Sequence, residues 1–178
     1  MNRIKRITVI TLGILLLVGC DITTKNKAHE ELKNNSSKSF LGGSVQLVYT
    51  ENSAGMLSFG DELPAVIKFV VFRIIVGILL IALLIYSFYR KDISKFQLLA
   101  ITLILSGGFG NLIDRIFNDG NVVDFIVLKI FNWHTGIFNL ADLYVTTGVT
   151  ILIVSSIILT KREEETAALS TNELDKDE

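Results

Sequence analysis

Four long apolar runs dominate this sequence of 178 residues. They cover about residues 7–22, 65–89, 96–117 and 137–159. A helix needs roughly 20 mostly apolar residues to cross the hydrocarbon core of a bilayer. Because these runs approach that length with few charges inside them, the sequence predicts a membrane α-helical protein with four transmembrane helices.

Basic residues predict how these helices are oriented. Lys and Arg cluster before the first run (3–6), between the second and third (90–95) and after the fourth (161–162). Basic loops stay on the cytoplasmic side of a membrane. We therefore expect both termini and the 90–95 loop to be cytoplasmic, and connections 23–64 and 118–136 to face outward.

Each outward connection contains a segment typical of a β-strand. Residues 26–33 are polar and suit a short helix, but residues 44–49 then alternate between apolar and polar side chains. Residues 122–127 are rich in β-branched side chains. We expect these two segments to form a small extracytoplasmic β-sheet, a cradle resting on the helix bundle.

The chain divides into one membrane domain and a tail. Residues 1–160 contain all four apolar runs and form a single predicted domain. Residues 161–178 are strongly acidic and have few apolar side chains to bury. We expect this segment to be a disordered cytoplasmic tail.

The first apolar run has two interpretations. It can be an uncleaved membrane helix, or it can be the apolar core of a signal peptide. Residues 17–20 (Leu-Val-Gly-Cys) resemble a bacterial lipobox, in which Cys20 would carry lipid and the preceding segment would be removed. Both interpretations place residue 21 outside the membrane.

Several classes of chemistry do not suit the sequence. Cys20 is the one cysteine, so no intramolecular disulfide can form. The two histidines, His29 and His134, lack the H-E-x-x-H spacing of a zinc protease. We expect no metal and no cofactor, and the charge pattern indicates no nucleic-acid partner.

The third run ends in a polar cluster. Asn111, Asp114 and Arg115 are three or four residues apart, so on a helix they share one face. Asp114 and Arg115 can form an ion network at the helix end. Gly107 and Gly110 would let another helix or a loop approach closely.

Two further aspartates have no basic neighbour of their own. Asp124 lies within an apolar run, and Asp142 follows Asn139 at the start of the fourth span. Each alone could cap a helix or stabilise a turn. Two carboxylates in a poorly hydrated site share one proton, so one can activate water while the other protonates the leaving group. Asp124 and Asp142 are therefore the candidate catalytic pair of a peptidase.

Three blocks of the sequence are similar to those of the lipoprotein signal peptidases, the signal peptidase II family. Residues 110–115 resemble the family's G-N-x-x-D-R, residues 122–125 its V-V-D-F, and residues 138–142 its F-N-x-A-D. Residues 21–25 resemble its D-x-x-T-K at the end of the first span. This last match favours an uncleaved first helix.

The resemblance implies both the activity and the site. The family removes signal peptides from diacylglyceryl-modified bacterial prolipoproteins, just before the lipidated cysteine. The chain would thus be a multi-pass plasma-membrane protein, active at the extracytoplasmic face, monomeric, with prolipoprotein and membrane lipid as its partners. The resemblance assigns catalysis to Asp124 and Asp142, support or substrate binding to Asn52, Asn111, Asp114, Arg115 and Asn139, and structural roles to Asp21, Lys25 and Gly110.

One block departs from the family pattern. The family has N-x-G-A-A-F or a similar sequence after its first strand, but residues 52–59 place Gly55 one position late. A catalytically divergent relative that acts as a binding or scaffold protein is therefore an alternative. An ion-coupled transporter is a weaker alternative, because the acids cluster at one membrane face and the sequence has no internal repeat.

Overall fold

The computed structural model describes residues 2–55, 59–90 and 93–174, with side chains as far as residue 158. The helical elements in chain order are α1 (Arg3–Leu32), the short η1 (Leu41–Gly43), α2 (Ala65–Phe69), the π-helical η3 (Val70–Ile75), α3 (Val76–Tyr89), α4 (Lys95–Phe117) and α5 (Leu140–Leu174). The strands are β1 (Lys38–Phe40), β2 (Val45–Asn52), β3 (Val122–Ile130) and β4 (Trp133–His134).

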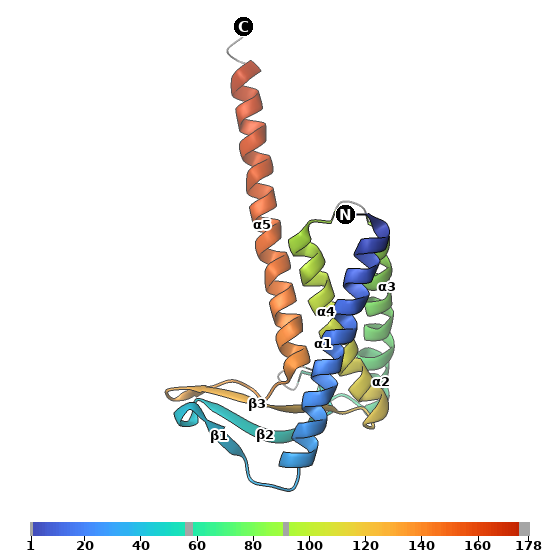
Figure 1. The fold of residues 1–178 in the computed structure, drawn as a ribbon, viewed down its shortest axis with the longest axis vertical. Helices are drawn as coiled ribbons and strands as arrows, with labels where there is room; N and C mark the ends of the chain where they lie inside the picture. The colour runs from blue at the N-terminus through green and yellow to red at the C-terminus, as the bar shows by residue number, and fades with distance from the viewer. Residues whose placement is uncertain (1, 56–58, 91–92, 175–178) are drawn as a thin grey trace.

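The described residues contain four helical segments long and apolar enough to span a membrane: Arg3–Leu32, Ala65–Tyr89, Lys95–Phe117 and Leu140–Ile158. They stand side by side as a bundle, with the small sheet across one end and the N-terminus at the other (Figure 1). The predicted membrane α-helical fold with four candidate spans and a small β-sheet is therefore confirmed.

Three helix bounds differ from the sequence prediction. α1 continues ten residues beyond residue 22, so the polar segment 23–32 extends the first span instead of forming a separate helix. The fourth span begins at Leu140, not at residue 137, because residues 137–138 run beside β3. Helix α5 also runs to Leu174, beyond residue 159. The disordered tail predicted for residues 161–178 stays a prediction.

The four strands form an antiparallel sheet in the order β1-β2-β3-β4. Between β2 and β3, Leu47 pairs with Ile126 but Thr50 pairs with Asp124, so β2 has one extra residue between these pairs. Such a bulge bends a strand and re-aims its side chains. The bulge lies directly before the pairing of Asp124.

The bundle core is centred on α4, which packs against α1, α3 and α5. Its apolar part includes Ile10, Leu80 and Leu105. The close approach predicted at the α4 glycines is confirmed. A Cβ at Gly107 would collide with the Ala141 carbonyl oxygen of α5, and one at Gly110 would lie 2.5 Å from Asp21 Oδ2 of α1.

A second apolar cluster attaches the sheet to the bundle. Ala28 and Leu32, in the last turns of α1, pack against Phe125 of β3, with Leu47 and Tyr49 of β2 around them. The extension of α1 beyond the first apolar run therefore forms the support on which β3, and with it Asp124, is held.

Candidate active site

Asp124 and Asp142 line one cavity of about 350 Å³, between the sheet and the ends of α4 and α5. Asp124 is 3% exposed, and Asp142 is half-buried. Polar side chains of Asn52 and Asn111 and apolar side chains such as Phe138 complete the walls. The two aspartates predicted to form a pair therefore face the same space.

The segment before α5 is positioned by β3. Phe138 forms an isolated antiparallel bridge with Ile126, and their main-chain N–H and C=O groups exchange hydrogen bonds of 2.8 and 3.0 Å. This pairing places Asn139 and the first turn of α5 beside Asp124.

Asn139 caps α5 and orients Asp142. The Asp142 main-chain N–H donates to Asn139 Oδ1 at 2.9 Å, and the Asn139 N–H donates to Asp142 Oδ2 at 3.2 Å. This reciprocal pattern is that of a capping box. Asp142 thus has the capping role expected of a single aspartate, but only one carboxylate oxygen is used for it.

A bridge of side-chain amides connects the two aspartates. Asn139 Nδ2 donates to Asp124 Oδ1 at 2.7 Å and to Asn111 Oδ1 at 3.1 Å. Asn111 Nδ2 donates to Asp142 Oδ1 at 2.9 Å. Within the described residues neither Asp124 nor Asp142 has an ion-pair partner within 4 Å. Their hydrogen bonds come from neutral donors, while the charges of Lys25 and Arg115 act from farther away.

This environment changes the pKa of Asp124. Burial, together with the nearby charge of Asp142, raises the pKa to about 6 from an ordinary value of 3.8. Hydrogen bonds from Asn52 and Asn139 act in the opposite direction because they stabilise the ionised form. The carboxyl of Asp124 therefore holds a proton to a higher pH than an exposed aspartate does.

Asn52 reaches the site from the end of β2. Its Nδ2 donates to Asp124 Oδ2 at 3.0 Å, and its Oδ1 accepts from the Ala54 N–H at 2.9 Å. The late glycine, Gly55, packs against Phe72, since an added Cβ would lie 3.2 Å from the ring. Residues 56–58 of the unusual block lie outside the described residues.

Lys25 is the centre of a second polar cluster, behind the aspartate pair. Its buried Nζ lies 2.7 Å from Asp21 Oδ2 and 3.0 Å from Asp114 Oδ2, and donates to Asn111 Oδ1 at 2.9 Å. The expected ion network of Asp114 with Arg115 does not form: the cation beside Asp114 is Lys25. Lys25 lies beyond the apolar run but still within α1, and this continuation of the helix places it against α4. A first helix that ended at residue 22 would not do so.

The two carboxylates beside Lys25 each hold a main-chain group next to a candidate catalytic residue. Asp114 Oδ2 accepts from the N–H of Val123 at 3.1 Å, and Asp21 Oδ1 accepts from the N–H of Ala141 at 2.9 Å. Each of these residues immediately precedes one of the paired aspartates. The Lys25 cluster therefore fixes the backbone on which the pair is mounted.

The side chain of Arg115 contacts the loop after Asn52 instead of Asp114. Its Nη2 donates to the Ala54 carbonyl oxygen at 2.7 Å, and its guanidinium lies 5.2 Å from the centre of the Phe72 ring. It also lines the cavity. Arg115 thus holds the loop that follows Asn52, a contact to a main-chain carbonyl that no sequence motif could indicate.

Sequence reasoning missed two structural parts of the site. One is the pairing of Phe138 with β3. The spacing of Asn139 and Asp142 is a helix-start signal, and it could have placed the start of the fourth helix after Asn139. The other is Phe72 beneath Arg115, which resembles any other apolar residue of the second span. Among residues 2–55, 59–90 and 93–174, no group of three or more His, Cys, Asp or Glu side chains is arranged to bind a metal.

Comparison with known proteins matches the whole membrane domain. The sequence model of the family described as signal peptidase (SPase) II matches residues 13–158. A lipoprotein signal peptidase of Borrelia turicatae is 38% identical over 122 residues, which are 65% of this chain and 69% of that protein. A lipoprotein signal peptidase of Streptococcus pneumoniae is 30% identical over 85% of this chain and 94% of its own length.

A solved structure of a bacterial membrane enzyme superposes with a TM-score of 0.77 and 30% sequence identity, covering 87% of this chain and 91% of that one. Four apolar helices, a small sheet and a carboxylate pair in a cavity define a membrane protease of the aspartic type. The chain belongs to the signal peptidase II family, and its function is that family's.

Proposed function

We propose that Asp124 and Asp142 are the catalytic pair, and that they hydrolyse the peptide bond before the lipidated cysteine of a diacylglyceryl-modified prolipoprotein. The observation that carries this proposal is the amide bridge of Asn139 and Asn111, which holds the two carboxylates on one cavity without a direct ion pair. A pair held by neutral donors can keep one proton between its members.

The proton has a defined route in this mechanism. Asp142, ionised, accepts a proton from water while the water oxygen bonds to the scissile carbonyl carbon. Asp124, whose pKa is raised to about 6 by burial, donates its proton to the carbonyl oxygen. When the tetrahedral intermediate collapses, the C–N bond breaks, the leaving amine takes the proton held by Asp142, and one hydroxyl of the intermediate returns its proton to Asp124. Asn52 and Asn139 support Asp124, and Asn111 supports Asp142.

The cavity walls suit a substrate that is partly apolar. Leu143 and Thr146, on the outer surface of α5, line the same cavity as the aspartates. A lipid-modified cysteine could leave its acyl chains along this helix in the bilayer while its peptide bond reaches Asp124 and Asp142.

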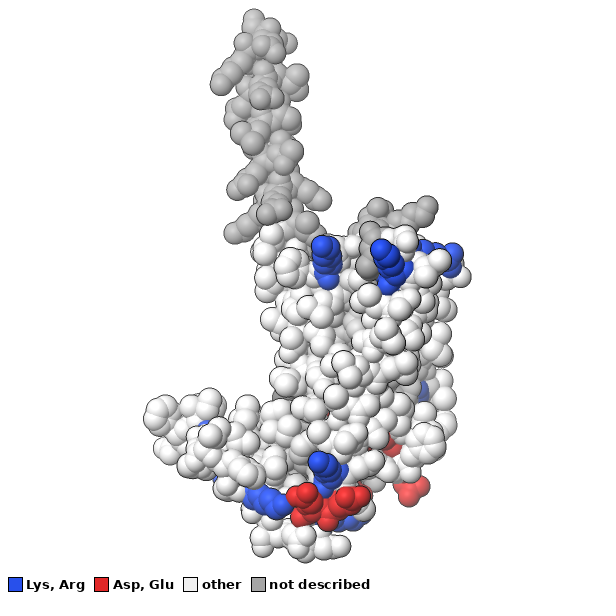
Figure 2. All heavy atoms as spheres, viewed as in Figure 1, with Lys and Arg blue, Asp and Glu red and all other residues white. Residues whose placement is uncertain are grey.

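Both termini are assigned to the cytoplasm and the site to the extracytoplasmic face. Arg6 donates to the carbonyl oxygens of Phe88 and Arg90, so the start of α1 and the end of α3 lie at one end of the bundle. Lys and Arg side chains gather at that end in the face shown, and charges of both signs gather at the sheet end (Figure 2). The positive-inside rule favours this orientation.

We assign the first helix as uncleaved and the active protein as a monomer. Cys20 is exposed in the middle of α1, one residue before Asp21, which is fully buried against α5. The mass of the mature N-terminus tests the first assignment, because lipobox processing would remove residues 1–19.

The central test uses the purified protein in detergent with a diacylglyceryl-modified prolipoprotein. The wild type should cleave it, Asp124→Asn and Asp142→Asn should not, and Glu30→Gln, an exposed acid of α1, should cleave like the wild type. Cleavage by both Asn variants would overturn the catalytic assignment. A wild type inert on every lipobox tested, while still folded, would favour the scaffold alternative that the altered Asn52 loop leaves open.

A further inference from the structure

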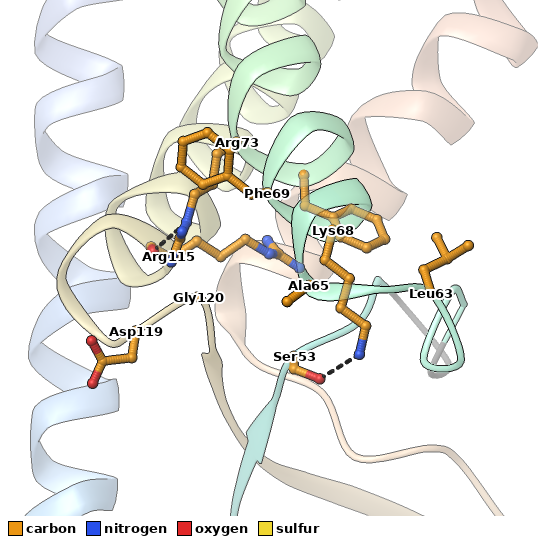
Figure 3. A pocket seen from close by; sticks show the side chains of 10 residues that line it. Ser53, Leu63, Ala65, Lys68, Phe69, Arg73, Arg115, Asp119 and Gly120 are labelled. Carbon is orange, nitrogen blue, oxygen red and sulfur yellow. Dashed lines mark hydrogen bonds between the residues drawn. The ribbon is translucent and has the colours of Figure 1, made fainter.

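A second cavity, of about 300 Å³, lies beside the first on the other side of Arg115. It is enclosed by the start of the second span, the loop after Asn52 and the turn at Gly120 (Figure 3). Three basic side chains line it: Lys68, Arg73 and Arg115. The proposed proteolysis uses neither Lys68 nor Arg73.

The cations of this cavity have donors to spare. Arg115 is 9% exposed, and its Nε is buried with no hydrogen-bond partner among the described residues. Arg73 uses its Nε to bond the Arg115 carbonyl oxygen at 2.7 Å. Its Nη2 lies against Gly120, where an added Cβ would be 2.9 Å away. Buried donors left unpaired are costly, so an acceptor in the cavity would stabilise them.

Three basic side chains and one acidic one, Asp119, line the cavity. Asp124, Asp142 and Asp114 act on Arg115 from outside the lining, so Lys68 and Arg73 supply most of the free positive charge. Lys68 Nζ lies 3.2 Å from Asp61, whose side chain is 66% exposed, and donates to Ser53 Oγ at 2.9 Å. Asp119 lines the cavity, but its carboxylate points away from Lys68 and Arg115 (Figure 3). The cavity is therefore a net positive site that suits an anion.

The position of the cavity indicates the kind of anion. The candidate second span begins at Ala65, so Lys68 and Arg73 lie within its first turns. This is the depth of the lipid headgroups. Phe69 lines the cavity, and it and Val66 are exposed on the same helix, 47% and 73% respectively, as an apolar surface for acyl chains.

We propose that this cavity binds the phosphate group of an anionic phospholipid in the extracytoplasmic leaflet. Arg73 and Arg115 supply the planar N–H pairs that match phosphate oxygens, and Lys68 supplies a point charge. The acyl chains follow the exposed side of α2 and η3. This site rests on the membrane orientation proposed above, but not on the peptidase activity.

Simple snorkelling of basic side chains to the interface would also place Lys68 and Arg73 at this depth. Snorkelling side chains end in water, however, whereas the Arg115 guanidinium is buried beneath Phe72 and a main-chain carbonyl. Snorkelling predicts no preference among headgroups beyond net charge at the surface. A built cavity predicts selective, saturable binding.

The test measures lipid binding to the delipidated full chain in detergent, by native mass spectrometry and by the shift in melting temperature. Phosphatidylglycerol, phosphatidylcholine and inorganic phosphate are added separately. Wild type should bind phosphatidylglycerol about tenfold more tightly than phosphatidylcholine, because both lipids carry the phosphate but the basic side chains repel the choline cation of the second. Lys68→Gln combined with Arg73→Gln should remove that preference.

The control is Lys129→Gln, which removes one positive charge from β3 on the same side of the membrane and should leave the preference intact. Melting in phosphatidylcholine alone shows that each variant is folded. Equal binding of both lipids by the wild type, or equal loss in the Lys129 variant, overturns the proposal. If inorganic phosphate alone gives the full shift in melting temperature, the ligand is free phosphate and not a phospholipid. Repeating the measurement in Asp142→Asn separates lipid binding from proteolysis.

Discussion

Two pairs of carboxylates lie side by side at the sheet end of the bundle, and their partners differ. Asp21 and Asp114 share the buried cation of Lys25, at 2.7 and 3.0 Å. In the part of the chain that the structure describes, Asp124 and Asp142 receive hydrogen bonds from amide side chains and main-chain N–H groups and have no direct ion pair. The same residue type therefore has two different electrostatic environments within one small region.

The difference separates a structural role from a chemical one. A buried carboxylate next to a cation can work as a fixed hydrogen-bond acceptor. Asp114 and Asp21 use that property to hold the N–H groups of Val123 and Ala141. A buried carboxylate bonded only to neutral donors can gain or lose a proton, which acid–base catalysis needs.

The largest expected effect concerns activity at Asp142. Asp142→Asn keeps an oxygen for the cap of α5 but cannot accept a proton from water. Cleavage of a diacylglyceryl-modified prolipoprotein should fall by about 10⁴-fold, the upper end for loss of one acid–base group. The free energy of unfolding should change by less than about 1 kcal/mol, because only one hydrogen bond is altered. If the Asn variant were inactive because it is unfolded, Asp142 would have a structural role like that of the Lys25 cluster, and the proposed difference between the two carboxylate pairs would fail.

The Lys25 cluster should respond in the opposite way, through stability. Lys25→Met leaves Asp21 and Asp114 buried without a cation, which costs about 3–5 kcal/mol of unfolding free energy. Lys33→Met, directly after the same helix, removes an exposed pair with Glu51 and should cost less than about 1 kcal/mol. Denaturant unfolding in detergent measures both. Similar losses in the two variants would mean that burial does not distinguish these lysines.

The sequence predicts which residues gather at the site better than it predicts what each one contacts. The long apolar runs predict the four spans, because their length and composition suit the hydrocarbon core of a bilayer. The motif blocks indicate Asp124 and Asp142. The partner of Asp114 could not be predicted in the same way. An adjacent Arg115 suggests an ion pair, whereas the true cation, Lys25, is 89 positions away and reaches Asp114 only because α1 is longer than its apolar run.

The fourth span shows the same limit at smaller scale. Residues 137–138 are as apolar as the helix that follows, and hydrophobicity alone cannot tell a strand-like pairing with β3 from a first helical turn. That pairing is what brings Asn139 to Asp124. The amide bridge therefore depends on tertiary contacts that a local pattern does not contain.

A smaller effect concerns stability against pH, and it follows from the pKa of about 6 at Asp124. Between pH 3.8 and 6 the unfolded chain ionises this carboxyl while the folded chain keeps it protonated. The folded state then binds more protons, so its stability falls as pH rises through this window. The contribution is complete below pH 3.8 and lost above pH 6.

The measurement compares wild type with Asp124→Asn, which cannot titrate. The stability of the wild type relative to the variant should decline by about 2 kcal/mol from pH 4 to pH 7. Asp119→Asn, at an exposed turn position, should follow the wild type at every pH. Parallel curves for wild type and Asp124→Asn would show that the carboxyl titrates as an exposed one does, and the contrast between the two carboxylate pairs would fail.

The smallest expected effect concerns Asn52, which acts on the pair only through Asp124. Asn52→Ala removes the hydrogen bond of 3.0 Å to Asp124 Oδ2, so kcat should fall about tenfold with little change in KM. Because that bond lowers the pKa of Asp124, its loss should also move the corresponding limb of the pH–rate profile to higher pH. Asn35→Ala, in an exposed turn, should change neither quantity. A fall in kcat with an unmoved pH profile would mean that Asn52 only shapes the loop through its bond to Ala54, and that the amides around Asp124 do not tune its proton.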